Sequence, residues 1–274
     1  MRSFVQRRVR NVGALMVALA GIWLLVRAQE RNLGASAFTT GYLLLAAVLF
    51  LALYNVRKRL PFLPLGSSAA WLQWHLYVGL GTVGVFALHI GTRWPSGVLD
   101  TALAVVYAFT VTSGVVGLYF TRTIPAQLAR VGEEVVFERI PAFQRHVCQQ
   151  AGGVVLGAVT ASGTTTLADF YVQRMYAFFE RRRGLSYLLW PTTTRRKSLM
   201  QEMQDLRRYL SDQEQGACEK LFGLVRRKDD LDFQEARQRL LKSWLFVHIG
   251  LTYALVMLAL LHGLLAHAFA GGGA

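Results

Sequence analysis

The sequence contains little cysteine and few acidic residues. Cys148 and Cys218 are its two cysteines. Neither a C-x-x-C pair nor a C-x-x-C-H motif occurs, which excludes cysteine-based zinc and iron–sulfur sites and covalently bound c-type haem. A glycine-rich phosphate loop, a dinucleotide-binding fingerprint and tandem repeats are also missing. Any cofactor is therefore expected to be held non-covalently.

Basic residues are abundant, and the chain is strongly apolar. The 30 Lys and Arg residues against 16 Asp and Glu give a net charge of +14, while 53% of all residues are hydrophobic. With a mean hydropathy of +0.33, this composition indicates several membrane spans. The cations concentrate in Arg2–Arg10, Arg57–Arg59 and the polar segment 122–242, where they mark the cytoplasmic side and can contact anionic lipid headgroups. We therefore expect membrane lipid, and no nucleic acid, as a partner.

Five apolar runs are long enough to cross a hydrocarbon core of about 30 Å, which takes about 20 helical residues. They are residues 11–27, 38–55, 70–91, 98–120 and 243–268. The predicted fold is an all-α membrane protein in which five transmembrane helices form a bundle, with a mainly helical cytoplasmic insertion between spans four and five. The predicted domains are an N-terminal transmembrane hairpin (1–60), spans three and four (61–121), the insertion (122–242), and span five with its tail (243–274).

The distribution of Lys and Arg in the short loops predicts the orientation. Arg2, Arg7, Arg8 and Arg10 precede the first span, and fewer cations follow it, so the N-terminus is expected on the inside. Alternation then makes the 122–242 insertion cytoplasmic, and spans three and five both run outward. We expect a multi-pass protein of the bacterial inner (cytoplasmic) membrane with a periplasmic C-terminus.

The insertion contains several helix patterns. Thr166–Arg182 is amphipathic, and Lys197–Leu210 and Ser211–Arg227 are predicted helices, the second with Ser211 as its N-terminal cap. Asp230–Lys242 is expected to continue without a break into span five. Gly132–Pro141 is predicted to be extended.

Two of the spans each carry two histidines at the same spacing. His75 and His89 in span three, and His248 and His262 in span five, are fourteen residues apart, which is just under four turns and about 21 Å of rise. Both histidines of a span thus share one face at two depths. If both spans run outward, His75 meets His248 at the inner level and His89 meets His262 at the outer level. Two facing imidazoles suit the axial positions of a low-spin haem.

Other roles for these histidines stay open at this stage. Intramembrane histidines also bridge helices by hydrogen bonds or relay protons. A shared zinc or copper ion is disfavoured, because histidines fourteen residues apart on one helix cannot reach the same metal, and neither span contains a carboxylate or a cysteine.

Three glycines and one arginine extend the predicted site. Gly79, Gly81 and Gly84 lie between the two histidines of span three, where a missing side chain would let either a flat macrocycle or a neighbouring helix approach. Arg93, just beyond His89, is a candidate donor to the propionates of the outer haem, or a cation at the membrane interface.

The four histidines resemble the ligand pattern of the transmembrane di-haem b cytochromes, a group that includes cytochrome b of quinol-oxidising complexes and ferric-reductase-like membrane domains. The resemblance covers residues 70–120 and 243–268. It implies two haem b groups, held by His75/His248 and His89/His262, and possible quinone chemistry. The 122–242 insertion departs from the pattern.

The expected function is that of a di-haem membrane subunit that moves electrons across the bilayer, between the quinone pool or a cytoplasmic donor and a periplasmic partner. Because the chain has no flavin or iron–sulfur motif, we expect other subunits, such as a multihaem c-type cytochrome or an iron–sulfur protein. The alternatives are a stand-alone membrane reductase of ferric iron or another metal, and a haem-free scaffold or proton-relay subunit.

Overall fold

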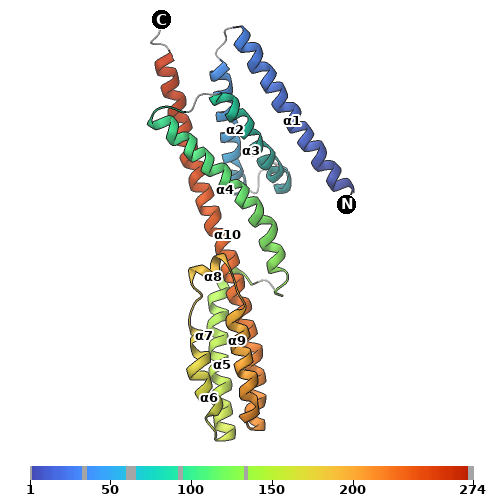
Figure 1. The fold of residues 1–274 in the computed structure, drawn as a ribbon, viewed down its shortest axis with the longest axis vertical. Helices are drawn as coiled ribbons and strands as arrows, with labels where there is room; N and C mark the ends of the chain where they lie inside the picture. The colour runs from blue at the N-terminus through green and yellow to red at the C-terminus, as the bar shows by residue number, and fades with distance from the viewer. Residues whose placement is uncertain (1, 33–35, 60–65, 92–94, 133–134, 271–274) are drawn as a thin grey trace. The chain divides into compact units, whose positions relative to one another are not determined.

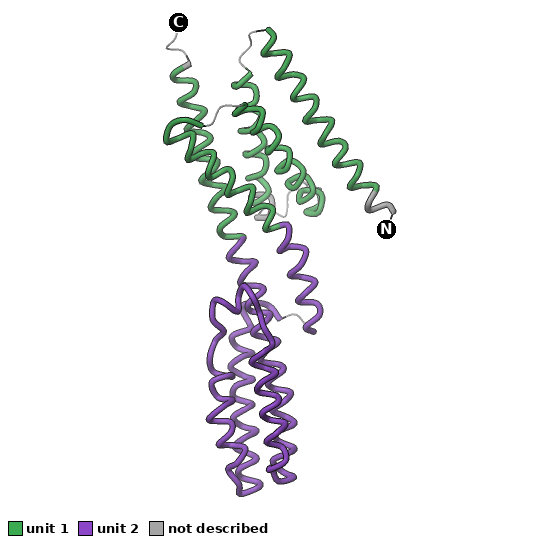
Figure 2. Tube along the Cα trace, in the orientation of Figure 1, with its two compact units in different colours: residues 1–117, 245–274 green, residues 118–244 purple. Residues whose placement is uncertain are grey.

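Every regular element in the described part of the chain is a helix. The computed structural model describes residues 2–32, 36–59, 66–91, 95–132 and 135–270 (Figure 1). The chain divides into two compact units (Figure 2): unit 1 comprises residues 1–117 and 245–274, and unit 2 comprises residues 118–244. Unit 2 thus contains the predicted 122–242 insertion, and the other predicted domains fall together in unit 1.

Unit 1 consists of long apolar helices. They are α1 (Arg2–Arg31), α2 (Ser36–Arg59), α3 (Ser68–Ile90), the first part of α4 (Val98–Leu128) and the last part of α10 (Asp212–Ala270). A helix satisfies all its internal backbone hydrogen bonds, which is why such sequences cross membranes in this form. The stretches of α1, α2, α4 and α10 that are long and apolar enough to span a bilayer are Gln6–Arg31, Ser36–Asn55, Val98–Leu128 and Asp212–Phe269.

Helix α3 is not among those four, although the sequence predicts a span over residues 70–91. Its 23 residues are sufficient in length, since about 20 cross a bilayer. Gln73, His75 and His89 lower its mean hydropathy, because these polar side chains are costly in lipid unless they face protein or a ligand. Four helices are therefore long and apolar enough to cross a membrane, and the fifth span remains a prediction.

Close packing within unit 1 joins the first three helices. Gly81 and Gly84 of α3 lie against α1: a Cβ at Gly81 would come within 3.1 Å of Leu15, and one at Gly84 within 2.8 Å of Leu19. Helices α2 and α3 also lie side by side. Small residues that let helices approach closely are typical of membrane interfaces.

The outer surface of unit 1 is apolar. Leu25, Phe109, Phe246 and Met257, for example, are more than 60% exposed. A water-soluble monomer rarely presents so much continuous apolar surface. Lipid, or another membrane subunit, is the environment in which this surface is stable.

Unit 2 is a helical bundle with its own core. Its elements after the end of α4 are a 3₁₀ turn (Phe137–Arg139), α5 (Ile140–Ser162), α6 (Thr166–Phe170), a π-helical turn (Tyr171–Met175), α7 (Tyr176–Glu180), α8 (Leu185–Leu189), α9 (Thr194–Leu206), a second 3₁₀ turn (Arg207–Tyr209) and the first part of α10. The core consists of fully buried side chains that include Ile140, Leu167, Met175, Met203 and Leu221.

Most helices predicted for this region are present. The amphipathic segment from Thr166 is helical to Glu180, and the segment around Lys197 forms α9. Helix α10 runs without a break from Asp212 to Ala270, as the sequence predicts for its second half. The extended conformation predicted for Gly132–Pro141 is wrong over its second half, where a 3₁₀ turn leads directly into α5.

The start of α10 is fixed by reciprocal hydrogen bonds. The Ser211 backbone N–H and hydroxyl donate to the Glu214 carboxylate at 3.2 and 3.1 Å, and the Glu214 N–H donates back to the Ser211 hydroxyl at 3.5 Å. This is a capping box. The other Glu214 oxygen accepts from the Leu167 N–H at 3.3 Å, so the same carboxylate joins the starts of α6 and α10.

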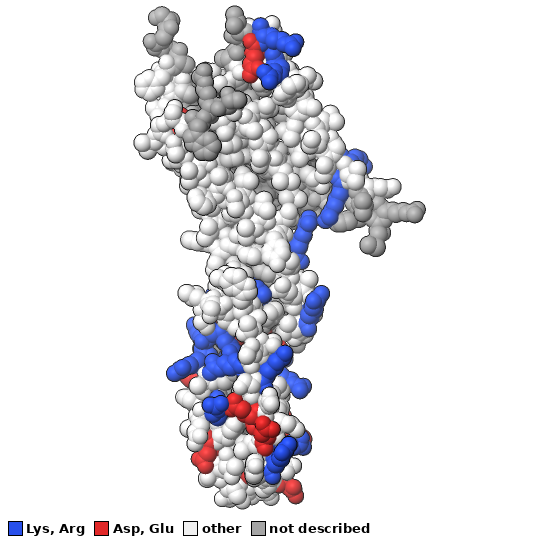
Figure 3. Space-filling view, in the orientation of Figure 1, with Lys and Arg blue, Asp and Glu red and all other residues white. Residues whose placement is uncertain are grey.

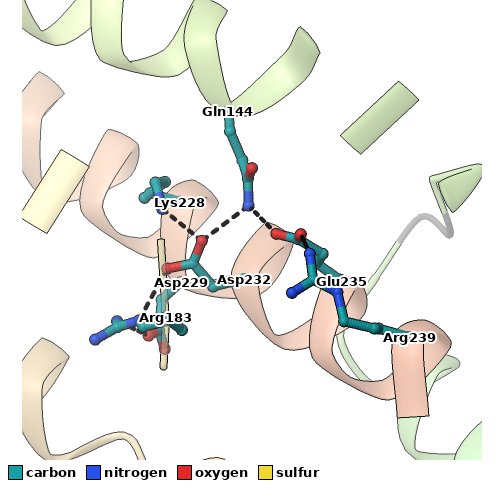
Figure 4. A network of polar contacts seen from close by, with 7 residues as sticks. All are labelled: Gln144, Arg183, Lys228, Asp229, Asp232, Glu235 and Arg239. Atoms are coloured by element: carbon teal, nitrogen blue, oxygen red, sulfur yellow. Dashed lines mark hydrogen bonds and ion pairs between the residues drawn. The ribbon is translucent and has the colours of Figure 1, made fainter. Parts of the chain in front are cut away.

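A buried ionic network joins α5, α10 and the segment after α7 (Figure 4). The Asp232 carboxylate, 1% exposed, accepts from Gln144 at 3.0 Å and from Arg183 at 2.9 Å, and it also pairs with Lys228. Arg183 reaches Asp229 at 3.0 Å as well. Each buried charge therefore has an opposite charge beside it, which offsets the cost of removing both from water.

Replacement of Asp232 tests how much unit 2 depends on this network. Asp232→Asn would leave Lys228 and Arg183 with less compensating charge in a buried site, and we expect a loss of about 3–5 kcal/mol in the free energy of opening unit 2. Native-state hydrogen exchange of α5 and α10 amides in the full-length protein in detergent measures this quantity.

The matched control is Glu219→Gln. It breaks the exposed Arg207–Glu219 pair, and exposed pairs contribute about 0–1 kcal/mol. Equal losses in both variants would contradict the assignment of stability to the buried network.

Candidate functional site

The four histidines of α3 and α10 meet as two pairs within unit 1. The ring centroids of His75 and His248 are 6.4 Å apart with the ring planes at 71°, and those of His89 and His262 are 6.3 Å apart at 84°. These are the pairs predicted from the fourteen-residue spacing. Their role as ligands stays a prediction.

The separation within each pair suits two imidazoles on opposite sides of one metal atom. An imidazole nitrogen lies about 2 Å from a transition metal that it binds and about 1.1 Å from its own ring centre, so two opposed rings have centres about 6.2 Å apart. Direct packing of two rings needs no such fixed distance. Because opposed imidazoles can rotate about the axis through the metal, both interplanar angles are compatible with this arrangement.

Three of the four rings have a polar partner at Nδ1. The Nδ1 atom of His89 is 2.9 Å from the Thr40 hydroxyl, that of His248 is 3.1 Å from the Ser113 hydroxyl, and that of His262 is 2.9 Å from an Asp100 carboxylate oxygen. A metal-binding histidine commonly bonds one ring nitrogen to such a group, which fixes the ring and leaves the other nitrogen for the metal.

The fourth ring is positioned by an aromatic neighbour. His75 packs against Tyr54 of α2, with ring centroids 5.2 Å apart. Thus α2 contacts a histidine of α3 at both levels, through Tyr54 at one and Thr40 at the other.

Each pair offers only two nitrogen ligands. Among the described residues, His, Cys, Asp and Glu side chains form no group of three or more that could hold a metal ion. A two-imidazole site suits a metal that brings its remaining ligands with it, as haem iron does with four nitrogens from the macrocycle.

An apolar cavity lies beside the second pair. Its volume is about 210 Å³, and His89, His262, Tyr42, Phe86 and Leu255 are among its lining residues. Gly41 also lines it: a Cβ there would come within 3.1 Å of the His89 ring. The cavity can take part of a planar macrocycle, and the remainder would lie between the helices.

A buried layer separates the two histidine levels. Thr82 lies midway between His75 and His89 in the sequence, and Leu255 lies midway between the other two histidines. Thr82 and Leu255 are 3% and 5% exposed. Tyr107 donates a hydrogen bond to Thr82 at 3.0 Å and stacks on Phe86 at 4.2 Å between ring centroids. This layer fixes the separation of the two sites and keeps water out.

The structure distinguishes the predicted glycines. Gly81 and Gly84 serve the packing of α1 on α3, whereas a Cβ at Gly79 would meet nothing within 4 Å. Gly79 therefore remains compatible with a group placed beside α3. Arg93, the predicted propionate donor, lies outside the described residues.

Sequence reasoning did not find the Nδ1 partners. Asp100 nevertheless carried a signal, since it is the single acidic residue within the five predicted spans. Thr40 and Ser113 carried none, because isolated hydroxyls are common in membrane helices. His267 also lines the cavity, where its ring lies 5.2 Å from Phe38 and 5.6 Å from Tyr42 between centroids, and it also bonds to the Tyr42 hydroxyl.

Comparison of the chain with protein-family models, with curated proteins and with solved structures found no match.

Proposed function

We propose that the chain is a di-haem b membrane protein that conducts electrons across the bilayer. His75 and His248 would hold one haem, and His89 and His262 would hold the other. The observation that carries the proposal is the repeated separation of 6.4 and 6.3 Å between paired ring centroids, at two levels of one bundle. A hydrogen-bonded helix contact would not be expected to repeat that spacing.

The protein's contribution is to hold, orient and shield the ligands. Thr40, Ser113 and Asp100 fix the ring orientations through Nδ1. The Tyr107 layer excludes water between the levels, which are separated by about 21 Å of helix rise. A bis-imidazole haem b supplies a low-spin centre that exchanges one electron.

The two sites differ in charge. His262 faces a carboxylate, and His248 faces a hydroxyl. A carboxylate that accepts the Nδ1–H makes the imidazole more basic, so it favours the ferric state. The site of His89 and His262 therefore has the lower reduction potential of the two, other factors being equal.

The proposed partners follow from the membrane setting. The electron donor is the quinone pool or a cytoplasmic donor, and the acceptor is a periplasmic multihaem c-type cytochrome or an iron–sulfur subunit, with the protein in a bacterial inner membrane. These assignments draw on the resemblance of the four histidines to di-haem b cytochromes.

Haem content is the first test. The purified protein should show the reduced-minus-oxidised spectrum of b haem, and pyridine haemochrome analysis should give two haems per chain. His75→Ala and His262→Ala should each remove one. His267→Ala is the matched control, because that ring lies in the same cavity but outside both pairs, and it should retain two. A colourless wild type would support the haem-free scaffold or proton-relay alternative instead.

Asp100→Asn tests the charge difference between the sites. We expect one of two potentials in a redox titration to rise by on the order of 50 mV, because about 1 kcal/mol of hydrogen-bond energy corresponds to roughly 40 mV for one electron. Haem content should not change. Ser113→Ala is the control on the other pair and should shift only the second potential; a shift of the same potential by both variants would refute the assignment of partners.

Gly41→Val tests the space beside His89. A side chain at position 41 would press on the ring, so the variant should lose or distort one haem, measured by haem content and electron paramagnetic resonance. Gly21→Val is the control, because a Cβ at Gly21 of α1 would meet nothing within 4 Å. Two intact haems in Gly41→Val would place the cofactor elsewhere.

A further inference from the structure

A short basic and apolar segment stands out on unit 2. It runs from the end of α7 through α8 to the start of α9, residues 181–197, and we call it the α8 segment. Leu185 is 80% exposed, Leu189 52% and Trp190 76%. Three large apolar side chains within six residues form a contact surface, whereas single exposed apolar residues on a protein need no explanation.

Arginines surround these apolar side chains. Arg181, Arg182 and Arg195 are exposed, and Figure 3 shows Lys and Arg gathered at the level of α8 in unit 2. The guanidinium groups of Arg183 and Arg195 lie over the same Phe178 ring, 5.0 and 5.8 Å from its centroid. These cations are therefore clustered, and an anionic partner would offset their mutual repulsion.

The inner side of the α8 segment is fastened to α10. Arg183 pairs with Asp229 and Asp232 and stacks on Tyr187, 5.0 Å from that ring's centroid. Burial and the nearby Asp229 charge raise the pKa of Tyr187 to about 12. The exposed residues are thus held on a fixed support and do not belong to a loose loop.

Helix α8 lies at the end of the unit 2 bundle where α10 continues into its apolar half (Figure 1). Arg183 of the α8 segment pairs with Asp229 and Asp232 of the same helix. Farther along α10, Trp244 stands where the apolar part of the helix begins, and tryptophan marks the boundary of membrane spans. The α8 segment therefore lies at the end of unit 2 that leads to the expected membrane boundary.

We propose that the α8 segment docks unit 2 onto anionic lipid headgroups, with Leu185, Leu189 and Trp190 inserted at the boundary of the acyl chains and the arginines bound to lipid phosphates. Interfacial segments commonly combine Trp and Leu on one side with cations beside them. Each arginine near an anionic surface contributes about fivefold to such an equilibrium. This inference is independent of haem binding.

A fluorescent label reports whether this contact forms. In a Cys148→Ser, Cys218→Ala background, Trp190→Cys is labelled with bimane, and the full chain is placed in nanodiscs containing phosphatidylglycerol and a lipid with a nitroxide on its headgroup. We expect strong quenching at position 190. The matched control is Tyr209→Cys, which is 79% exposed and lies just before α10 begins, about 48 Å of helix rise from Trp244; it should not be quenched.

Charge dependence completes the test. In nanodiscs of neutral lipid, or after Arg181→Gln and Arg182→Gln, quenching at position 190 should fall several-fold, while circular dichroism shows that the variants remain folded. Quenching at position 190 no stronger than at position 209 would overturn the proposal and assign the exposed segment to a protein partner. Quenching that is insensitive to both lipid charge and the arginine substitutions would also overturn it.

Discussion

The cost of placing an imidazole in a membrane is the constraint on which unit 1 depends. A polar ring in the apolar part of a bilayer is stable only against protein, water or a ligand. Protein groups meet this requirement at the Nδ1 atoms of three rings: Thr40 contacts His89, Ser113 contacts His248, and Asp100 contacts His262. Each of the four rings also lies beside a second histidine. The positions of α2, α4 and α10 around α3 follow from these contacts, because each helix supplies a partner at a histidine level.

The two units compensate their buried polar side chains in different ways. Unit 1 has few polar groups between its helices, among them the histidine pairs and the Tyr107–Thr82 bond. Unit 2 buries full charges, and compensates Asp232 with Lys228, Arg183 and Gln144. Such pairing is needed because a buried charge without a counter-charge is costly in a medium of low dielectric constant. Helix α10 takes part in both arrangements along its 59 residues.

Periodicity in the sequence was sufficient for the helices and for the histidine pairs. A spacing of fourteen residues puts two side chains on one helical face, so the match of His75 with His248 and of His89 with His262 needed only the assumption that two spans run in the same direction. Glycine was less informative. Gly79, Gly81 and Gly84 look equivalent in the sequence, but only the position of Leu15 and Leu19 on α1 shows that Gly81 and Gly84 serve helix packing.

The sequence by itself determined an all-helical fold with helices apolar enough to cross a membrane, and the pairing of four histidines, because hydrophobicity and helical period are local properties of the chain. The tertiary structure decided which residues support those histidines. Thr40, Asp100 and Ser113 are 49, 162 and 135 residues away from their partners in the chain, and no local pattern encodes such contacts. It also decided that the arginines of the α8 segment flank exposed Leu and Trp side chains, since exposure depends on how the whole bundle packs.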